Sequence, residues 1–144
     1  MARAYTRAEH QTIGVDIGVC DSLQLWDVAG EPVYEPLAEV STRNAAVIVL
    51  AYRDTASFIA LQQRFVPRAR VEQRRCVARG RSAPRLLLLA LDADERDAVH
   101  EAYARSIGAE YALVTVASRV SRADAFRLIT SLIDTERGPR ASDD

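Results

Sequence analysis

The sequence predicts an α/β fold, with a mostly parallel sheet of about five strands and helices on both faces. Two near-continuous apolar runs, residues 45–52 and 85–91, are typical of strands buried on both faces of such a sheet. Between these runs and after the second one, apolar residues recur at helical spacing. Residues 13–20 and 22–27 alternate apolar and polar side chains, which predicts an antiparallel pair of strands ahead of the parallel part.

Composition indicates a globular protein. The 144 residues are 49% hydrophobic and 27% charged, and a net charge of −1 gives no reason to expect nucleic acid as a partner. The longest apolar run, residues 86–91, is too short to span a bilayer, and residues 1–10 contain no apolar signal segment. The two cysteines lack metal-ligand spacing, so we expect free thiols and a cytoplasmic protein. The sequence contains no lysine, which excludes any mechanism that needs a lysine from this chain.

The first half of the chain offers one chemical motif. Asp27 follows an alternating strand, and a carboxylate at such a position can reach a hydrated Mg²⁺. Gly30 can offer its backbone N–H to a phosphate oxygen with no side chain in the way. Pro32 and Pro36 then disfavour a regular helix over residues 31–37.

Helices are predicted around the two apolar strands. Asp54 or Thr55 caps a helix over residues 56–79, in which Pro67 introduces a kink. Seven arginines between residues 64 and 81 form either a solvated helix face or a patch for an acidic partner. Later elements are a helix over 95–107 that stops at Gly108, a strand over 111–116, and a final helix opened by Ser121 or Asp124.

Three segments carry a resemblance to a known family. Residues 26–30, Trp-Asp-Val-Ala-Gly, resemble the Trp-Asp-Thr-Ala-Gly-Gln-Glu signature of Ras-superfamily small GTPases, and of Rab proteins in particular. Residues 12–16, Thr-Ile-Gly-Val-Asp, are similar to the Rab switch I segment, and residues 52–58 to the start of a Rab helix. The resemblance covers roughly residues 11–133, with a lead-in over 1–10 and a polar tail over 134–144.

The resemblance implies GTP or GDP and Mg²⁺ as ligands, and it implies a role for individual residues. It makes Thr12 and Asp27 the Mg²⁺ ligands and Gly30 the contact of the γ-phosphate. It makes Asp94 the residue that contacts the guanine base, with Asp92 as the second choice. It places Ala117 and Ser118 in the loop that contacts guanine. Asp94 has an alternative role as the cap of the next helix.

Departures from the family pattern lower the expected activity. Glu31 stands at the position of the catalytic Gln, and its charge opposes the γ-phosphate, so we expect impaired GTP hydrolysis. Leu91 and Asp92 replace the family Asn and Lys of the guanine motif. The family's first strand, its Gly-rich phosphate loop with a lysine, and its first helix have no counterpart in these residues, so we expect weak nucleotide binding or none.

The resemblance implies a regulatory protein of intracellular vesicle traffic. It would bind protein effectors or regulators through a switch-like surface, residues 11–37, and a partner or oligomer could supply the missing central strand. No prenylation cysteine ends the sequence, so membrane association would be peripheral, at endomembranes and through partners. The alternatives are a truncated form of an active Rab GTPase, a non-enzymatic interaction module, and an unrelated α/β domain.

Overall fold

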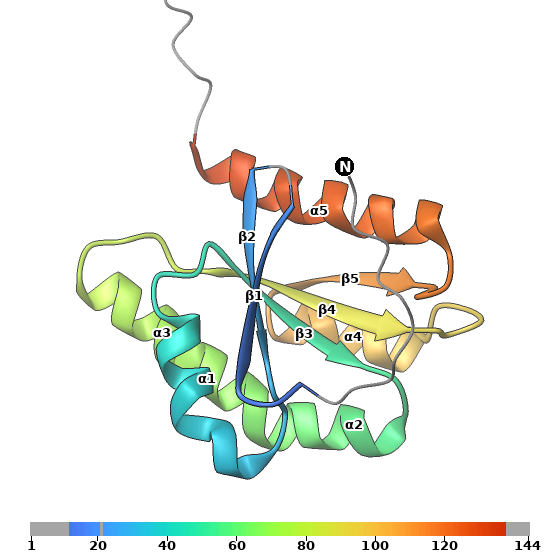
Figure 1. The fold of residues 1–144 in the computed structure, drawn as a ribbon, viewed down its shortest axis with the longest axis horizontal. Coiled ribbons are helices and arrows are strands. Elements are labelled where there is room, and N and C mark those ends of the chain that lie inside the picture. The colour runs from blue at the N-terminus through green and yellow to red at the C-terminus, as the bar shows by residue number, and fades with distance from the viewer. Residues whose placement is uncertain (1–11, 21, 138–144) are drawn as a thin grey trace, which may run out of the picture. The chain divides into compact units, whose positions relative to one another are not determined.

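The computed structural model describes residues 12–20 and 22–137 (Figure 1). The chain divides into two compact units, residues 1–43 and 44–144, where the sequence predicted one domain over 11–133. The predicted lead-in over residues 1–10 and the last part of the polar tail lie outside the described residues.

The first unit begins with an antiparallel hairpin, as predicted. Strand β1 (Val15–Cys20) pairs with β2 (Leu23–Val28), and Ile17 lies directly opposite Trp26. The hairpin is followed by the 3₁₀ turn η1 (Pro32–Tyr34) and the helix α1 (Glu35–Thr42).

The expectation that Pro32 and Pro36 disfavour a regular helix over residues 31–37 is wrong from Glu35 onward, where α1 begins. Pro32 is the first residue of η1, and Pro36 lies in the first turn of α1. At the start of a helix the N–H that proline lacks has no intrahelical acceptor, so proline is tolerated there.

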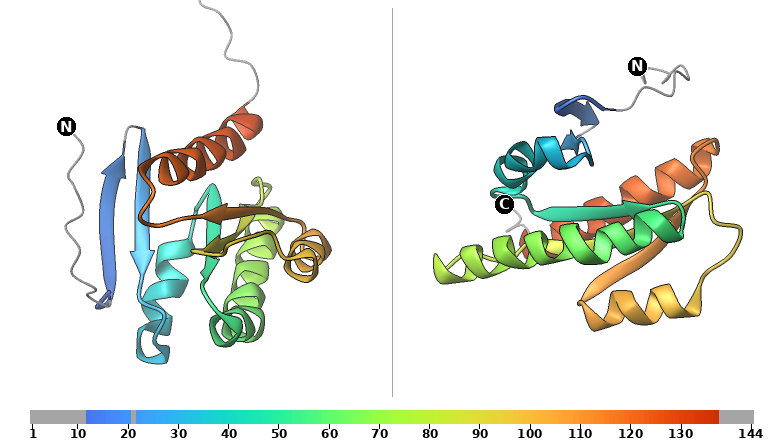
Figure 2. Two further views of the ribbon diagram at one scale, coloured as in Figure 1. Left: turned by 90° about the vertical axis from the view of Figure 1, so that its right-hand side faces the viewer. Right: turned by 90° about the horizontal axis from the view of Figure 1, so that it is seen from below.

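The second unit contains a three-stranded parallel sheet in the order β3-β4-β5. Helix α5 lies on one face of this sheet, and the other helices of the second unit lie on the opposite face (Figure 2). The strands are β3 (Val47–Tyr52), β4 (Arg85–Leu91) and β5 (Ala109–Val114). The helical segments are α2 (Thr55–Ala60), the π-helical turn η2 (Leu61–Phe65), α3 (Val66–Ala78), α4 (Ala98–Ser106) and α5 (Arg119–Arg137).

The five strands of the described residues therefore form two sheets, whereas a single sheet of about five strands was expected. Strand β2 pairs with β1 through a short turn, and β3 pairs with β4, so β2 and β3 share no ladder. The apolar pattern of a strand indicates which of its faces is buried, but it does not identify the neighbouring strand.

Burial confirms the prediction for β4 and corrects it for β3. Leu87 and Leu88 point to opposite faces of the sheet, and both are 0% exposed. In β3, Leu50 is buried but Val49 is 38% exposed. Strand β3 is the edge of its sheet, so its second face is only partly covered.

The helix ends of the second unit follow local chemistry. Asp54 caps α2 as predicted, accepting the Ser57 N–H at 2.7 Å, and this bond lowers the pKa of Asp54. The predicted kink takes the form of η2, because the missing N–H and the ring of Pro67 disturb the helix before it. Gly108, at a φ of +68°, ends α4 as predicted.

The start of α5 was predicted incorrectly. Neither Ser121 nor Asp124 opens the helix, which begins at Arg119. The Ser118 hydroxyl oxygen accepts the Ser121 N–H at 3.2 Å, so Ser118 is the capping residue. Several residues of this segment have side chains that can cap, and the pattern alone does not choose among them.

The burial of Leu88 leads to a stability prediction. Leu88→Ala removes side-chain volume from a fully buried position, so the free energy of unfolding should fall by about 2–5 kcal/mol. Urea unfolding followed by far-UV circular dichroism measures this change. The control is Val120→Ala on α5, where the side chain is 69% exposed and a change within about 0.5 kcal/mol is expected. Equal effects of the two substitutions would contradict the central position of β4.

Candidate functional site

The two residues assigned to Mg²⁺ contact each other in the first unit. Thr12 Oγ1 donates a hydrogen bond to Asp27 Oδ2 at 2.7 Å. The two residues are far apart in the sequence, and the hairpin brings them together. The register of β1 with β2 is extended by a hydrogen bond of 2.9 Å from the Ala29 N–H to the Gly14 carbonyl.

A second carboxylate lies across the hairpin from Asp27. Asp16 is its direct partner in the antiparallel register, and both residues are exposed. Like charges directly opposite each other destabilise a strand pair, and a bound cation would relieve this repulsion. Carboxylate and hydroxyl oxygens are hard ligands of the kind that Mg²⁺ accepts, so these residues fit a partly hydrated Mg²⁺.

The protein alone supplies few ligands for such a cation. Among the described residues, no three His, Cys, Asp or Glu side chains group closely enough to hold a metal. A cation at the hairpin would therefore complete its octahedral shell with water or with phosphate oxygens. It would supply positive charge beside those oxygens, while Asp27 and Thr12 would hold it in place.

The other two predicted residues of this unit lie just beyond β2. Gly30 and Glu31 are both exposed. Glu31 immediately precedes η1, and its carbonyl accepts the Tyr34 N–H at 3.0 Å. Its backbone thus begins the turn that leads into α1.

On the guanine side, the Asp92 carboxylate is engaged within the protein. Asp92 accepts the Val116 N–H at 2.7 Å and forms an ion pair with Arg53 at 3.3 Å. These contacts connect the carboxyl ends of β3, β4 and β5 and leave Asp92 poorly placed to select a base. Asp94 is exposed, and its alternative role as a helix cap is wrong, because Asp97 caps α4.

The predicted guanine loop lies between β5 and α5. Ala117 is exposed, whereas Ser118 is half-buried and caps α5. The predicted site residues thus fall into two groups. Asp92, Asp94, Ala117 and Ser118 belong to the second unit, and the other four belong to the first.

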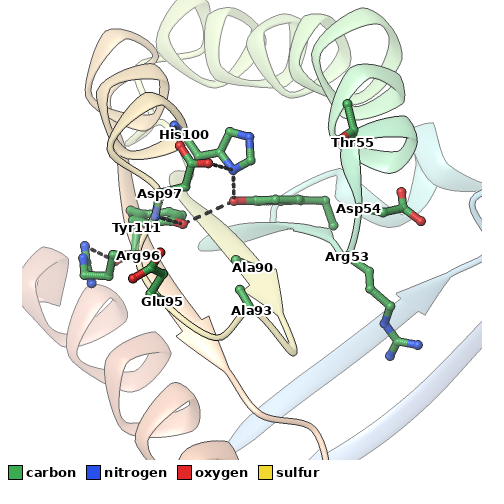
Figure 3. Close-up of a pocket in the computed structure, with 11 residues that line it drawn as sticks. Arg53, Asp54, Thr55, Ala90, Ala93, Glu95, Arg96, Asp97, His100 and Tyr111 are labelled. Atoms are coloured by element: carbon green, nitrogen blue, oxygen red, sulfur yellow. Dashed lines mark hydrogen bonds and ion pairs between the residues drawn. The ribbon is translucent and has the colours of Figure 1, made fainter.

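Sequence reasoning missed a cavity of about 270 Å³ at the carboxyl ends of the parallel strands (Figure 3). The Tyr52 hydroxyl, at the end of β3, lies 2.9 Å from His100 Nδ1 and 3.3 Å from the Tyr111 hydroxyl. His100 belongs to α4, and its ring centroid lies 4.0 Å from that of Phe58. His100 therefore packs against Phe58 and is also part of a polar network.

The hydroxyl at the centre of this network stays protonated. Burial and the hydrogen bond with Tyr111 raise the pKa of Tyr52, so its hydroxyl keeps its proton at neutral pH. The backbone N–H groups of His100 and Val99 lower the pKa of Asp97, which therefore stays ionised. The network can hydrogen-bond a small polar molecule, and its members are already engaged with one another.

The partners in this network are far apart in the sequence, so no local motif could reveal them. One signal was available. Tyr52 ends a buried strand, and the carboxyl ends of neighbouring parallel strands share one edge of a sheet, where sites commonly lie. His100 lies in the helix that follows the next strand, β4, and could have been considered with Tyr52, whereas Tyr111 lies within β5.

Comparisons with known proteins add no relative. Neither a scan against protein-family models nor a search of curated proteins finds a match for this chain. In the described part of the chain, no helix is long and apolar enough to cross a membrane. The resemblance described above thus stands on the residues of the chain alone.

The cap of α4 leads to a prediction with a defined pH dependence. Asp97 has a lowered pKa in the folded protein, so its contribution is present above the unfolded pKa of about 4 and is lost as pH falls through the folded pKa. Asp97→Ala should lower the free energy of unfolding at pH 7, and the deficit should shrink toward pH 3. Urea unfolding at both pH values measures it. Asp94→Ala is the matched control; an equal deficit there would contradict the assignment of the cap.

Proposed function

We propose that this chain is a regulatory protein related to Rab-like small GTPases, which binds protein partners through residues 11–37 and binds nucleotide weakly or not at all. By the resemblance, its setting is intracellular vesicle traffic. The observation that carries the proposal is the exposed apolar pair of Ile17 and Trp26 on the hairpin, at 50% and 46% exposure.

This pair belongs to a larger apolar face. Val19 lies on the same side of β1 as Ile17 and is 78% exposed. Exposed apolar side chains that adjoin one another mark interaction sites, and tryptophan is enriched among the residues that dominate binding energy. The face falls within the switch-like surface that the resemblance implies.

Two further observations support the relation to small GTPases and the loss of tight nucleotide binding. The contact between Thr12 and Asp27 supports a remnant Mg²⁺ site. The ion pair and hydrogen bond of Asp92, together with the absence of lysine from the 144 residues, argue against a working nucleotide site. Glu31 adds a charge that repels a γ-phosphate.

The proposal also accounts for the two sheets. In the family that the sequence resembles, one sheet contains both strand groups with a central strand between them. Among the described residues, β3 pairs only with β4, so its second edge can accept a further strand. A strand-supplying partner or a second copy of the chain would complete such a sheet.

Nucleotide binding is tested by titration of the purified chain with a fluorescent GTP analogue and Mg²⁺, followed by competition with GDP. We expect a dissociation constant well above about 1 μM, because no lysine neutralises the phosphates. Circular dichroism confirms that the chain is folded. Guanine-selective binding at micromolar concentration or tighter would contradict the proposal and favour a working switch.

Partner binding is tested through Trp26, the single tryptophan of the chain. Proteins that bind the wild-type chain in a capture experiment should not bind the Trp26→Ser and Ile17→Ser variants. Binding of a purified candidate partner to the wild-type chain should shift the fluorescence emission of Trp26 to shorter wavelength. Val99→Ser on α4 is the control, because Val99 is 73% exposed and lies outside the hairpin. Partners retained by the hairpin variants, or lost equally with the control, would contradict the assigned surface.

A further inference from the structure

We propose that a groove along the second half of α3 binds an acidic peptide segment that carries an apolar side chain. This surface is separate from residues 11–37 and requires no nucleotide, so it stands independently of the proposed function. The groove has a volume of about 660 Å³, and its lining residues are Arg70, Gln73, Arg74, Val77, Ala78 and Ala83.

The groove is built from two segments that are fastened together. Residues 70, 73, 74 and 77 follow helical spacing, so they present one side of α3. Ala83 belongs to the loop that leads into β4. Gln73 Nε2 donates a hydrogen bond of 3.0 Å to the Pro84 carbonyl, which holds this loop against the helix.

The segment that contains the groove is rich in positive charge, and two of its arginines, Arg70 and Arg74, line the groove itself. Residues 64–81 contain seven arginines and one acid, Glu72, for a net charge of +6, although the whole chain has a net charge of −1. Glu72 is only 4% exposed, and one of its oxygens lies 3.0 Å from Arg75. The only acid of the segment is therefore directed inward and does not neutralise the groove.

The two arginines of the groove have no acidic partner among the residues that the structure describes. Arg70 donates to the neutral amide of Gln73 at 3.2 Å, and Arg74 is exposed. A guanidinium group binds a carboxylate through two parallel hydrogen bonds, so both arginines are suited to acidic side chains.

The remaining lining of the groove is apolar. Val77 is 64% exposed, and Ala78 and Ala83 adjoin it in the groove. This composition favours a peptide with carboxylates near Arg70 and Arg74 and one aliphatic side chain over Val77. No aromatic side chain lines the groove for base stacking, and a bilayer surface is too flat to enter a hollow, so nucleic acid and membrane fit less well.

Fluorescence anisotropy tests the proposal with a short fluorescein-labelled peptide of aspartate, glutamate and two leucines. Arg74→Glu should weaken binding by about tenfold, because it reverses a contacting charge. Arg74→Gln should weaken it less. Arg119→Glu, at the exposed start of α5, makes the same change in net charge and should alter affinity by less than about twofold.

The apolar contact is tested with Val77→Ser and a peptide in which serine replaces leucine. Val77→Ser alone, or the serine-substituted peptide alone, should weaken binding by about threefold or more. The peptide change should have little further effect on the affinity of the Val77→Ser variant. Circular dichroism melting confirms that each variant is folded.

Equal losses in Arg74→Glu and Arg119→Glu would overturn the proposal, since binding would then follow net charge alone. The proposal would also be overturned if the peptide affinity stayed the same both in Val77→Ser and when serine replaced leucine in the peptide. Tighter Arg74-dependent binding to phosphatidylserine vesicles or to single-stranded RNA than to the peptide would assign the groove to another class of partner.

Discussion

The second unit depends on the burial of β4 on both faces. Successive side chains of a strand point in opposite directions, and those of Leu87 and Leu88 are both withdrawn from water. Covering them requires helices on each face, which α5 supplies on one side and α2, α3 and α4 supply on the other. The connections between the parallel strands carry α2, α3 and α4, and α5 follows the last strand, so the apolar sequence of one strand determines much of the unit's layering.

Parallel pairing has a second consequence, because it gathers the loops that follow β3, β4 and β5 at one edge. There the polar side chains mostly satisfy one another. Asp92, in the loop after β4, accepts a hydrogen bond from Val116 and forms an ion pair with Arg53. The Tyr52 hydroxyl lies within hydrogen-bond distance of both His100 and Tyr111. Burial of the Tyr52 hydroxyl without such partners would be costly, and a cavity of about 270 Å³ lies beside this network.

The sequence allowed good prediction where the physical signal is local. Alternation along β1 and β2 predicted the hairpin, and the cap of α2 was narrowed to Asp54 or Thr55 because a cap and its partner lie within one turn. Prediction failed where the outcome depends on position or on distant partners. Pro36 disfavours a helix interior but not a first turn, and no local motif around Tyr52 identifies His100 as its partner. Thr12 and Asp27 were grouped by resemblance, and the hairpin places them in contact.

The groove on α3 owes its charge entirely to guanidinium groups. Acetylation and ubiquitination act on the ε-amino group of lysine, which none of the 144 residues provides. Arginine remains protonated throughout the physiological pH range, and methylation leaves its charge in place while blocking paired hydrogen bonds. The positive charge of Arg70 and Arg74 therefore does not change with physiological pH or with lysine modification, and arginine methylation would change the geometry of the hydrogen bonds while leaving the charge.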